Sequence, residues 1–94
     1  MNAPTVQHID ISGYRGRAGD TIAIRAVDDF SVTKVSVQIR NAAGTLIEEG
    51  EAAKGLNCWR YRVTVPNLSI SGSTIRATAF DRPGNTGISV AHIS

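Results

Sequence analysis

Cysteine and aromatic residues are both scarce in this chain of 94 residues. Cys58 is the one cysteine, so an internal disulfide and a thiolate-rich zinc site are both excluded. Aromatic residues make up 5% of the chain, which leaves few side chains for stacking on nucleic-acid bases or sugar rings. As the single cysteine, Cys58 is interpreted as an inert small side chain; the alternative is an exposed thiol for intermolecular pairing.

The chain also lacks a dominant charge and a long apolar run. Its formal net charge is +2, which is too small to indicate a nucleic-acid partner. No apolar stretch approaches the ~20 residues that a helix needs to cross a bilayer, and residues 1–10 show no basic-then-apolar signal segment. Hydrophobic residues still make up 41% of the chain. We expect one domain over residues 1–94 with its core in 5–93, taken from a larger multidomain protein, with neither nucleic-acid binding nor membrane insertion.

Alternation of apolar and polar residues dominates the chain in place of a helical period. The one helical candidate, residues 46–56, is interrupted by Gly50 and Gly55. Short stretches rich in Val, Ile and Thr, separated by turn residues, are typical of strands. The sequence predicts seven strands, at residues 5–11, 21–27, 34–40, 45–49, 59–65, 74–80 and 86–93.

Each predicted strand has one apolar face, so two sheets can bury these faces against each other. The connections offer no crossover helices, which favours antiparallel pairing. The predicted fold is therefore an all-β, antiparallel sandwich. The large Trp59 side chain is predicted at the centre of the core. The other residues expected inside are Ile9, Ile11, Ile22, Ile24, Ala26, Val35, Val37, Ile39, Tyr61, Val63, Val65, Ile75, Ala77, Ala79, Ile88 and Val90.

Three stretches follow one another in a particular order. They read AGDTIAIRAVDDFSVTKVSVQIRNAAGTLIEEGEA, then WRYRV, then GSTIRATAFDRPGNTG. In this order and spacing they resemble bacterial immunoglobulin-like (Big-type) domains. The family pattern has a Gly-Asp entry to the second strand, a turn with Gly44, and a last hairpin that here carries Ala79, Asp81, Gly84 and Asn85. The resemblance covers residues 5–93. It implies a seven-stranded antiparallel sandwich of the immunoglobulin-like or fibronectin-III-like type.

The chain departs from antibody domains in three respects. It has no cysteine pair, its tryptophan lies on the fifth predicted strand instead of the third, and no tyrosine stands where a tyrosine corner needs one. It is thus similar to the cysteine-free modules that occur in tandem in bacterial surface proteins. This resemblance implies an extracellular or cell-surface location, contacts with neighbouring domains of the same chain, and a spacer or adhesive role.

The stretch FDRPGNTG, residues 80–87, is the strongest candidate for a special loop. Proline second and glycine third in Arg82–Asn85 is the pattern of a type II turn. Asp81 and Asn85 can accept hydrogen bonds from loop amides, so the first interpretation is a hairpin turn. The alternative is calcium, which prefers oxygen ligands. The loops after the second and sixth strands should lie at one end of the sandwich, which would group Asp28, Asp29, Asp81 and Asn85.

The remaining polar candidates favour surface roles. Neither His8 nor His92 has a serine or a carboxylate at a spacing that would indicate a catalytic site. We interpret both as surface residues of strands. The segment GYRGRAG, residues 13–19, is not followed by the helix that a phosphate cradle needs. Arg25, Arg60 and Arg62 are expected to form a row on one outer sheet face.

No pair of a nucleophile and a base emerges from this sequence, so we do not expect an enzyme. The prediction is a non-catalytic structural or adhesive module of a multidomain bacterial surface or secreted protein. The alternative is a ligand-binding module for calcium, a glycan or a protein, which would use the loops at residues 28–33, 50–57 and 81–85.

Overall fold

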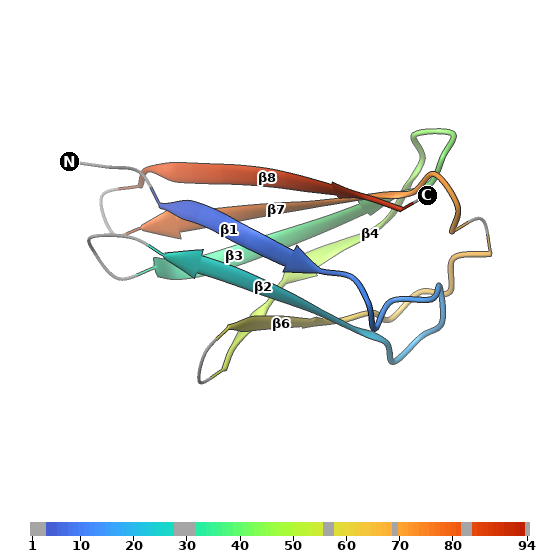
Figure 1. Cartoon of the computed structure of the whole chain (residues 1–94), viewed down its shortest axis with the longest axis horizontal. Helices are drawn as coiled ribbons and strands as arrows, with labels where there is room; N and C mark the ends of the chain where they lie inside the picture. The colour runs from blue at the N-terminus through green and yellow to red at the C-terminus, as the bar shows by residue number, and fades with distance from the viewer. Residues whose placement is uncertain (1–3, 28–31, 56–57, 69, 82–83, 94) are drawn as a thin grey trace.

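The described residues form eight strands, paired antiparallel in two four-stranded sheets (Figure 1). The computed structural model describes residues 4–27, 32–55, 58–68, 70–81 and 84–93. Sheet A has the strand order β1 (Thr5–Asp10), β2 (Thr21–Val27), β6 (Trp59–Arg62), β5 (Ala53–Lys54). Sheet B has the order β4 (Leu46–Glu51), β3 (Val32–Arg40), β7 (Thr74–Asp81), β8 (Thr86–His92). The described residues form no helix, and hence none long and apolar enough to cross a membrane.

The predicted core is confirmed at its centre. Ile24, Val35, Val37, Val63, Ile75 and Ala77 each retain at most 1% of their exposed surface. Alternation along β2, β3 and β7 points five of them into the space between the sheets, and Val63 directly follows β6. Trp59 is buried, with 9% exposure, but it stands at the beginning of β6 and not at the centre of the core. The largest side chains that are fully buried are aliphatic.

The strand count differs from the expected seven because the segment predicted as a loop over 50–57 contains strand. β4 continues to Glu51, and the two residues of β5 pair with Arg60 and Trp59. Between them, the Ala52 amide donates to the Val35 carbonyl at 2.8 Å. This hydrogen bond extends the pairing of β4 with β3 by one residue, and the chain then enters sheet A at β5. A strand of two residues carries no periodic pattern that a sequence could show.

β6 ends at Arg62 and not at residue 65, as the alternation had suggested. Beyond it, Val63 is buried but Val65 is 39% exposed, so Val65 does not belong to the core. The amides of Thr64 and Val65 donate to the carboxylate of Glu48. The strand stops because a side chain, and not a neighbouring strand, takes these hydrogen bonds.

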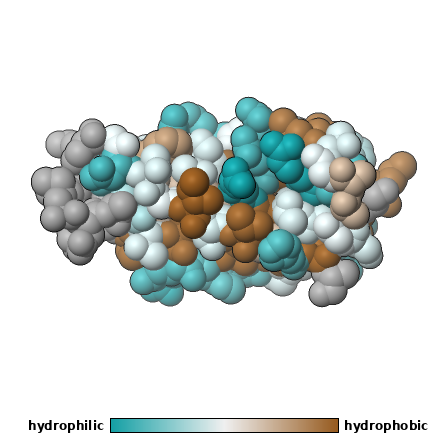
Figure 2. Space-filling view, turned by 90° about the horizontal axis from the view of Figure 1, so that it is seen from above, coloured by the Kyte–Doolittle hydropathy of each residue, from teal (hydrophilic) through white to brown (hydrophobic). Residues whose placement is uncertain are grey.

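The prediction that Ile88 and Val90 point inward is wrong. They are 58% and 40% exposed. Ile88 lies opposite Thr78 and Val90 opposite Arg76, and directly opposite residues share a face. Gly87, Ser89 and Ala91 point inward instead. Figure 2 views the molecule from the β8 side of Figure 1 and shows hydrophobic groups standing among polar ones on this surface.

The reason for this orientation is the close approach of β1 to β8. A Cβ atom at Gly87 would overlap the carbonyl oxygen of Pro4. Gly87 lies opposite the buried Ala79, so that Cβ would point between the sheets. Only small side chains fit on the inner side of β8 here, and the larger Ile88 and Val90 must face outward.

The chain enters and leaves the fold at opposite ends of its long axis. The molecule measures 40 × 25 × 19 Å. β1 begins at the end where β7 turns into β8, and β8 runs to the other end (Figure 1). β2 and β7 both end on the side where β1 begins, and Val32 pairs with Asp81 there.

Candidate functional site

Within the FDRPGNTG stretch, Asp81, Gly84 and Asn85 close a hairpin between β7 and β8. The Asp81 amide donates to the Asn85 carbonyl, and the Gly84 amide donates to the Asp81 carbonyl, both at 3.1 Å. The Asp81 carboxylate accepts from the Asn85 amide at 2.8 Å and from its side-chain Nδ2 at 3.4 Å. Gly84 has a φ of 93°, which glycine adopts without a Cβ penalty. The turn interpretation is therefore confirmed for these residues.

The calcium interpretation depends on residues on two loops. Asp28 and Asp29 lie outside the described residues, so their distance from the turn is not part of the structure. Asp81 and Asn85 lie together, but Asp81 is only 4% exposed and both its oxygens accept from Asn85. Within the described ranges, no three His, Cys, Asp or Glu side chains are grouped as metal ligands. A calcium site at these four residues stays a prediction.

The backbone amides of the glycine-rich segment between β1 and β2 already bind the carboxylate of Asp20. The Asp20 carboxylate accepts from the amides of Arg15 and Arg17 at 2.9 and 3.0 Å. These hydrogen bonds lower the pKa of Asp20 below its ordinary value. A phosphate would have to compete with this carboxylate for the same amides, so the loop acts as a closed turn.

The other polar candidates lie on the surface of the sheets. His8 and His92 are exposed on β1 and β8. Arg25, Arg60 and Arg62 are exposed on the outer face of sheet A, as expected. Cys58 is half-buried.

A buried carboxylate that the sequence did not reveal connects the two sheets. Glu48 of β4 is 8% exposed. Its Oε2 accepts from the Tyr61 hydroxyl at 2.5 Å and from the Thr64 hydroxyl at 3.0 Å. Its Oε1 accepts from the amides of Thr64 and Val65 at 3.1 and 3.0 Å. Glu48 thus ties sheet B to β6 and to the segment that follows β6.

The titration of this pair follows from the same contacts. Burial acts to raise the pKa of Glu48, but hydrogen bonds from Tyr61, Val65 and Thr64 together outweigh it and leave the pKa below its ordinary value. Burial and the neighbouring Glu48 carboxylate raise the pKa of the Tyr61 hydroxyl, so Tyr61 stays protonated as the donor. Gly50 provides room for the ring, since a Cβ there would lie 3.1 Å from Tyr61 Cε1. With its oxygens occupied and little exposed, Glu48 is suited to structure and not to proton transfer.

A second polar cluster lies at the end of the sandwich away from the β7–β8 turn (Figure 1). Asn67 Nδ2 donates to the Tyr14 hydroxyl at 3.2 Å and to Ser73 Oγ at 2.9 Å. All three residues are buried. The Asn67 amide donates to the Gly16 carbonyl at 2.7 Å. This cluster joins the β1–β2 connection to the β6–β7 connection and fixes two long loops on the core.

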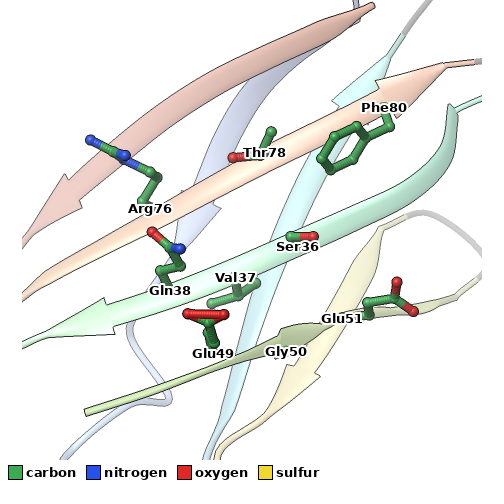
Figure 3. A pocket seen from close by; sticks show the side chains of 9 residues that line it. All are labelled: Ser36, Val37, Gln38, Glu49, Gly50, Glu51, Arg76, Thr78 and Phe80. Atoms are coloured by element: carbon green, nitrogen blue, oxygen red, sulfur yellow. The ribbon is translucent and has the colours of Figure 1, made fainter. Parts of the chain in front are cut away.

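The outer face of sheet B carries a shallow groove of 410 Å³. Figure 3 shows Phe80 and Glu51 nearer one end and Arg76 nearer the other. Lys34 Nζ lies 4.5 Å from the centre of the Phe80 ring and 3.7 Å from Glu51 Oε1. The groove is lined by Ser36, Val37, Gln38, Glu49, Gly50, Glu51, Arg76, Thr78 and Phe80. It offers hydrogen-bond donors, acceptors and charges of both signs, as a polar ligand would need.

No protein-family model and no curated protein matches this sequence. Among solved structures, the chain is similar to the crystal structure of an engineered protein from the Northeast Structural Genomics Consortium. The two share 25% sequence identity with a TM-score of 0.70 over 97% of this chain. This chain spans 20% of the length of that protein. The comparison supports the two-sheet β-sandwich and carries no information on function.

Proposed function

We propose that this chain is a non-catalytic, immunoglobulin-like structural or adhesive module of a multidomain bacterial surface or secreted protein. The strand orders support the immunoglobulin-like assignment. β1-β2-β6-β5 corresponds to the A-B-E-D sheet of such domains, and β3-β7-β8 corresponds to the C-F-G sheet. β4 extends that second sheet at the C edge. With β5 counted as one of the seven strands that the resemblance implied, β4 is the eighth.

The observation that carries the spacer role is the direction of the chain through the fold. The chain enters at the beginning of β1 and leaves after β8 at the other end of the 40 Å axis (Figure 1). A neighbouring domain at each end would extend the array instead of folding back on it. Two buried polar ties, at Glu48 and at Asn67, connect the elements across the sandwich and favour a rigid unit.

The state of the carboxylates supports a non-catalytic role. Asp20, Glu48 and Asp81 each accept hydrogen bonds from amides of their own chain. A general base needs a lone pair that can reach a substrate proton, and these three groups direct theirs into turns and the core.

A tandem fusion tests the spacer role. Two copies joined through a short linker should give, in small-angle X-ray scattering at low concentration, a maximum dimension near twice the 40 Å length of one copy. A maximum dimension little larger than that of one copy would show that the copies fold back, and would contradict the proposal.

The groove on sheet B favours a second candidate, which is a module that binds a glycan or a polar segment of a protein. In this candidate the ligand lies across β4, β3 and β7, and not on the loops at residues 28–33, 50–57 and 81–85. Arg76→Ala should abolish binding to an immobilised glycan array, whereas Arg60→Ala, an exposed arginine on the outer face of sheet A, should leave it unchanged. Equal binding by wild type and Arg76→Ala would exclude the groove.

A further inference from the structure

β8 is an edge strand with an unusual composition. Its outward row is Thr86, Ile88, Val90 and His92, and its sequence contains no Lys, Arg, Asp, Glu or Pro. Its register with β7 is continuous from the Thr74–His92 pair to the Phe80–Thr86 pair. Edge strands usually carry charges, prolines or bulges that prevent pairing with another chain. β8 has none of these protections.

The other three edges of the sandwich are protected. β4, at the far edge of sheet B, carries Glu48, Glu49 and Glu51, and its register with β3 shifts between Ile39 and Arg40. β1 carries Asp10 and a register shift between Val6 and His8. β5 has two residues, one of them Lys54. The contrast singles out β8 among the edges in the described part of the chain.

β1 packs against β8, and its close contact at Gly87 is on the inner side of the strand. The contact at Gly87 places the Pro4 carbonyl on the inner side of the strand, between the sheets. β8 is the terminal strand of sheet B. The surface seen from this side presents hydrophobic groups near its middle (Figure 2), and Ile88 and Val90 are 58% and 40% exposed.

We propose that β8 is a self-association edge, at which a second copy of this chain pairs antiparallel with β8 and extends sheet B to eight strands. The occupant is a second copy because β8 is complementary to itself. A two-fold axis at Ser89, the middle residue of the strand, places Ile88 of each copy opposite Val90 of the other copy. Pairs of β-branched residues across strands are favourable, and no like charges oppose each other.

The charge of the whole chain permits this contact. A net charge of +2 gives two copies little mutual repulsion. The same pairing at β4 would bring the exposed Glu49 and Glu51 of each copy together. Pairing of two seven-residue strands buries a small interface, so the dimer should form in a concentration-dependent way.

Sedimentation velocity from about 10 µM to about 1 mM tests the proposal. The mean mass of the wild type should rise toward twice the monomer mass. Val90→Lys should remain monomeric, and Ile88→Lys serves as a second variant if the first does not fold. Leu46→Lys is the matched control because Leu46 is 39% exposed at the other edge of the same sheet. It should dimerise like the wild type, with thermal melts verifying that each variant is folded.

Hydrogen exchange on the concentrated wild type locates the contact. Amides of residues 86–92 should exchange more slowly than in the dilute protein. A wild type that stays monomeric at the highest concentration would overturn the proposal and leave the edge to a strand of another protein. A dimer that persists in Val90→Lys, or that protects amides other than those of β8, would overturn it as well.

Discussion

β3 and β8 flank the same strand, β7, and bury opposite kinds of side chain. β3 points Val35, Val37 and Ile39 into the core, and each has 0% exposure. β8 points Gly87, Ser89 and Ala91 inward and exposes Ile88 and Val90. Both strands alternate regularly in sequence. The difference therefore lies in what packs beneath each strand, and not in the pattern itself.

Hydrophobic alternation determines the inward face only where the space between the sheets can hold large side chains. β3 has such space. Beneath the beginning of β8, the backbone at Pro4 approaches so closely that glycine is required at position 87. Small inward side chains follow from this contact, and the hydrophobic side chains become an outer surface. The following predictions test this difference, beginning with the largest expected effect.

Truncation of one residue on each strand should separate the two most clearly. Ile39→Ala should lower the free energy of unfolding by ~2–5 kcal/mol, because it removes a fully buried side chain. Ile88→Ala should change it by less than about 0.5 kcal/mol, as for other surface sites. Urea unfolding measured at low protein concentration compares the two. Equal losses would mean that β8 also buries its hydrophobic row.

A methyl group added beneath β8 tests the close approach directly. Gly87→Ala should cost ~1–3 kcal/mol, since the new Cβ must displace the backbone of Pro4. Ser89→Ala, two residues further on the same face, is the control and should be nearly neutral. If both variants melted at the wild-type temperature, the close approach of Pro4 to Gly87 could not explain why β8 points its small side chains inward.

Glu48 shows the opposite failure of the pattern, because a charged residue points inward from β4. The hydrogen bonds leave its pKa below the ordinary value, so its contribution to stability is present above the unfolded-state pKa and is lost as the pH falls. At neutral pH, Glu48→Gln should cost ~1–3 kcal/mol. The difference between the variant and the wild type should shrink below about pH 4.5. A difference independent of pH would show that the charge of Glu48 does not matter.

The smallest expected effect concerns calcium. The calcium alternative predicts that ~5 mM calcium, above the dissociation constants of many extracellular modules, raises the melting temperature. The closure of Asp81 onto Asn85 leads us to expect no change. A rise that disappears in Asp28→Ala and Asp29→Ala would establish the site, whereas a rise that persists in both would place calcium elsewhere.

Much of the fold follows from local patterns. Regular alternation predicted seven of the eight strands, and residues such as Val37 and Ile75 lie on the faces that their parity predicted. The hairpin closed by Asp81, Gly84 and Asn85 was also predictable, because glycine has a strong positional preference in turns.

The features that the sequence did not reveal depend on contacts between distant segments. Glu48 lies in a strand with Glu49 and Glu51, and nothing local distinguishes the buried carboxylate from the exposed ones. Its partners come from 13 to 17 residues further along the chain. The orientation of β8 depends on Pro4, at the far end of the sequence. The groove on sheet B likewise gathers side chains from three strands.

The orientation of β8 can be measured by thiol labelling of the native protein. Val90→Cys and Ala91→Cys, each in a Cys58→Ser background, place one thiol on either side of the strand. Labelling rates follow the exposure of the thiol. At low micromolar concentration, the cysteine at position 90 should react much faster than the one at position 91. A faster reaction at position 91 would show that β8 points Ile88 and Val90 into the core, and would contradict the account of this strand as an exposed hydrophobic edge.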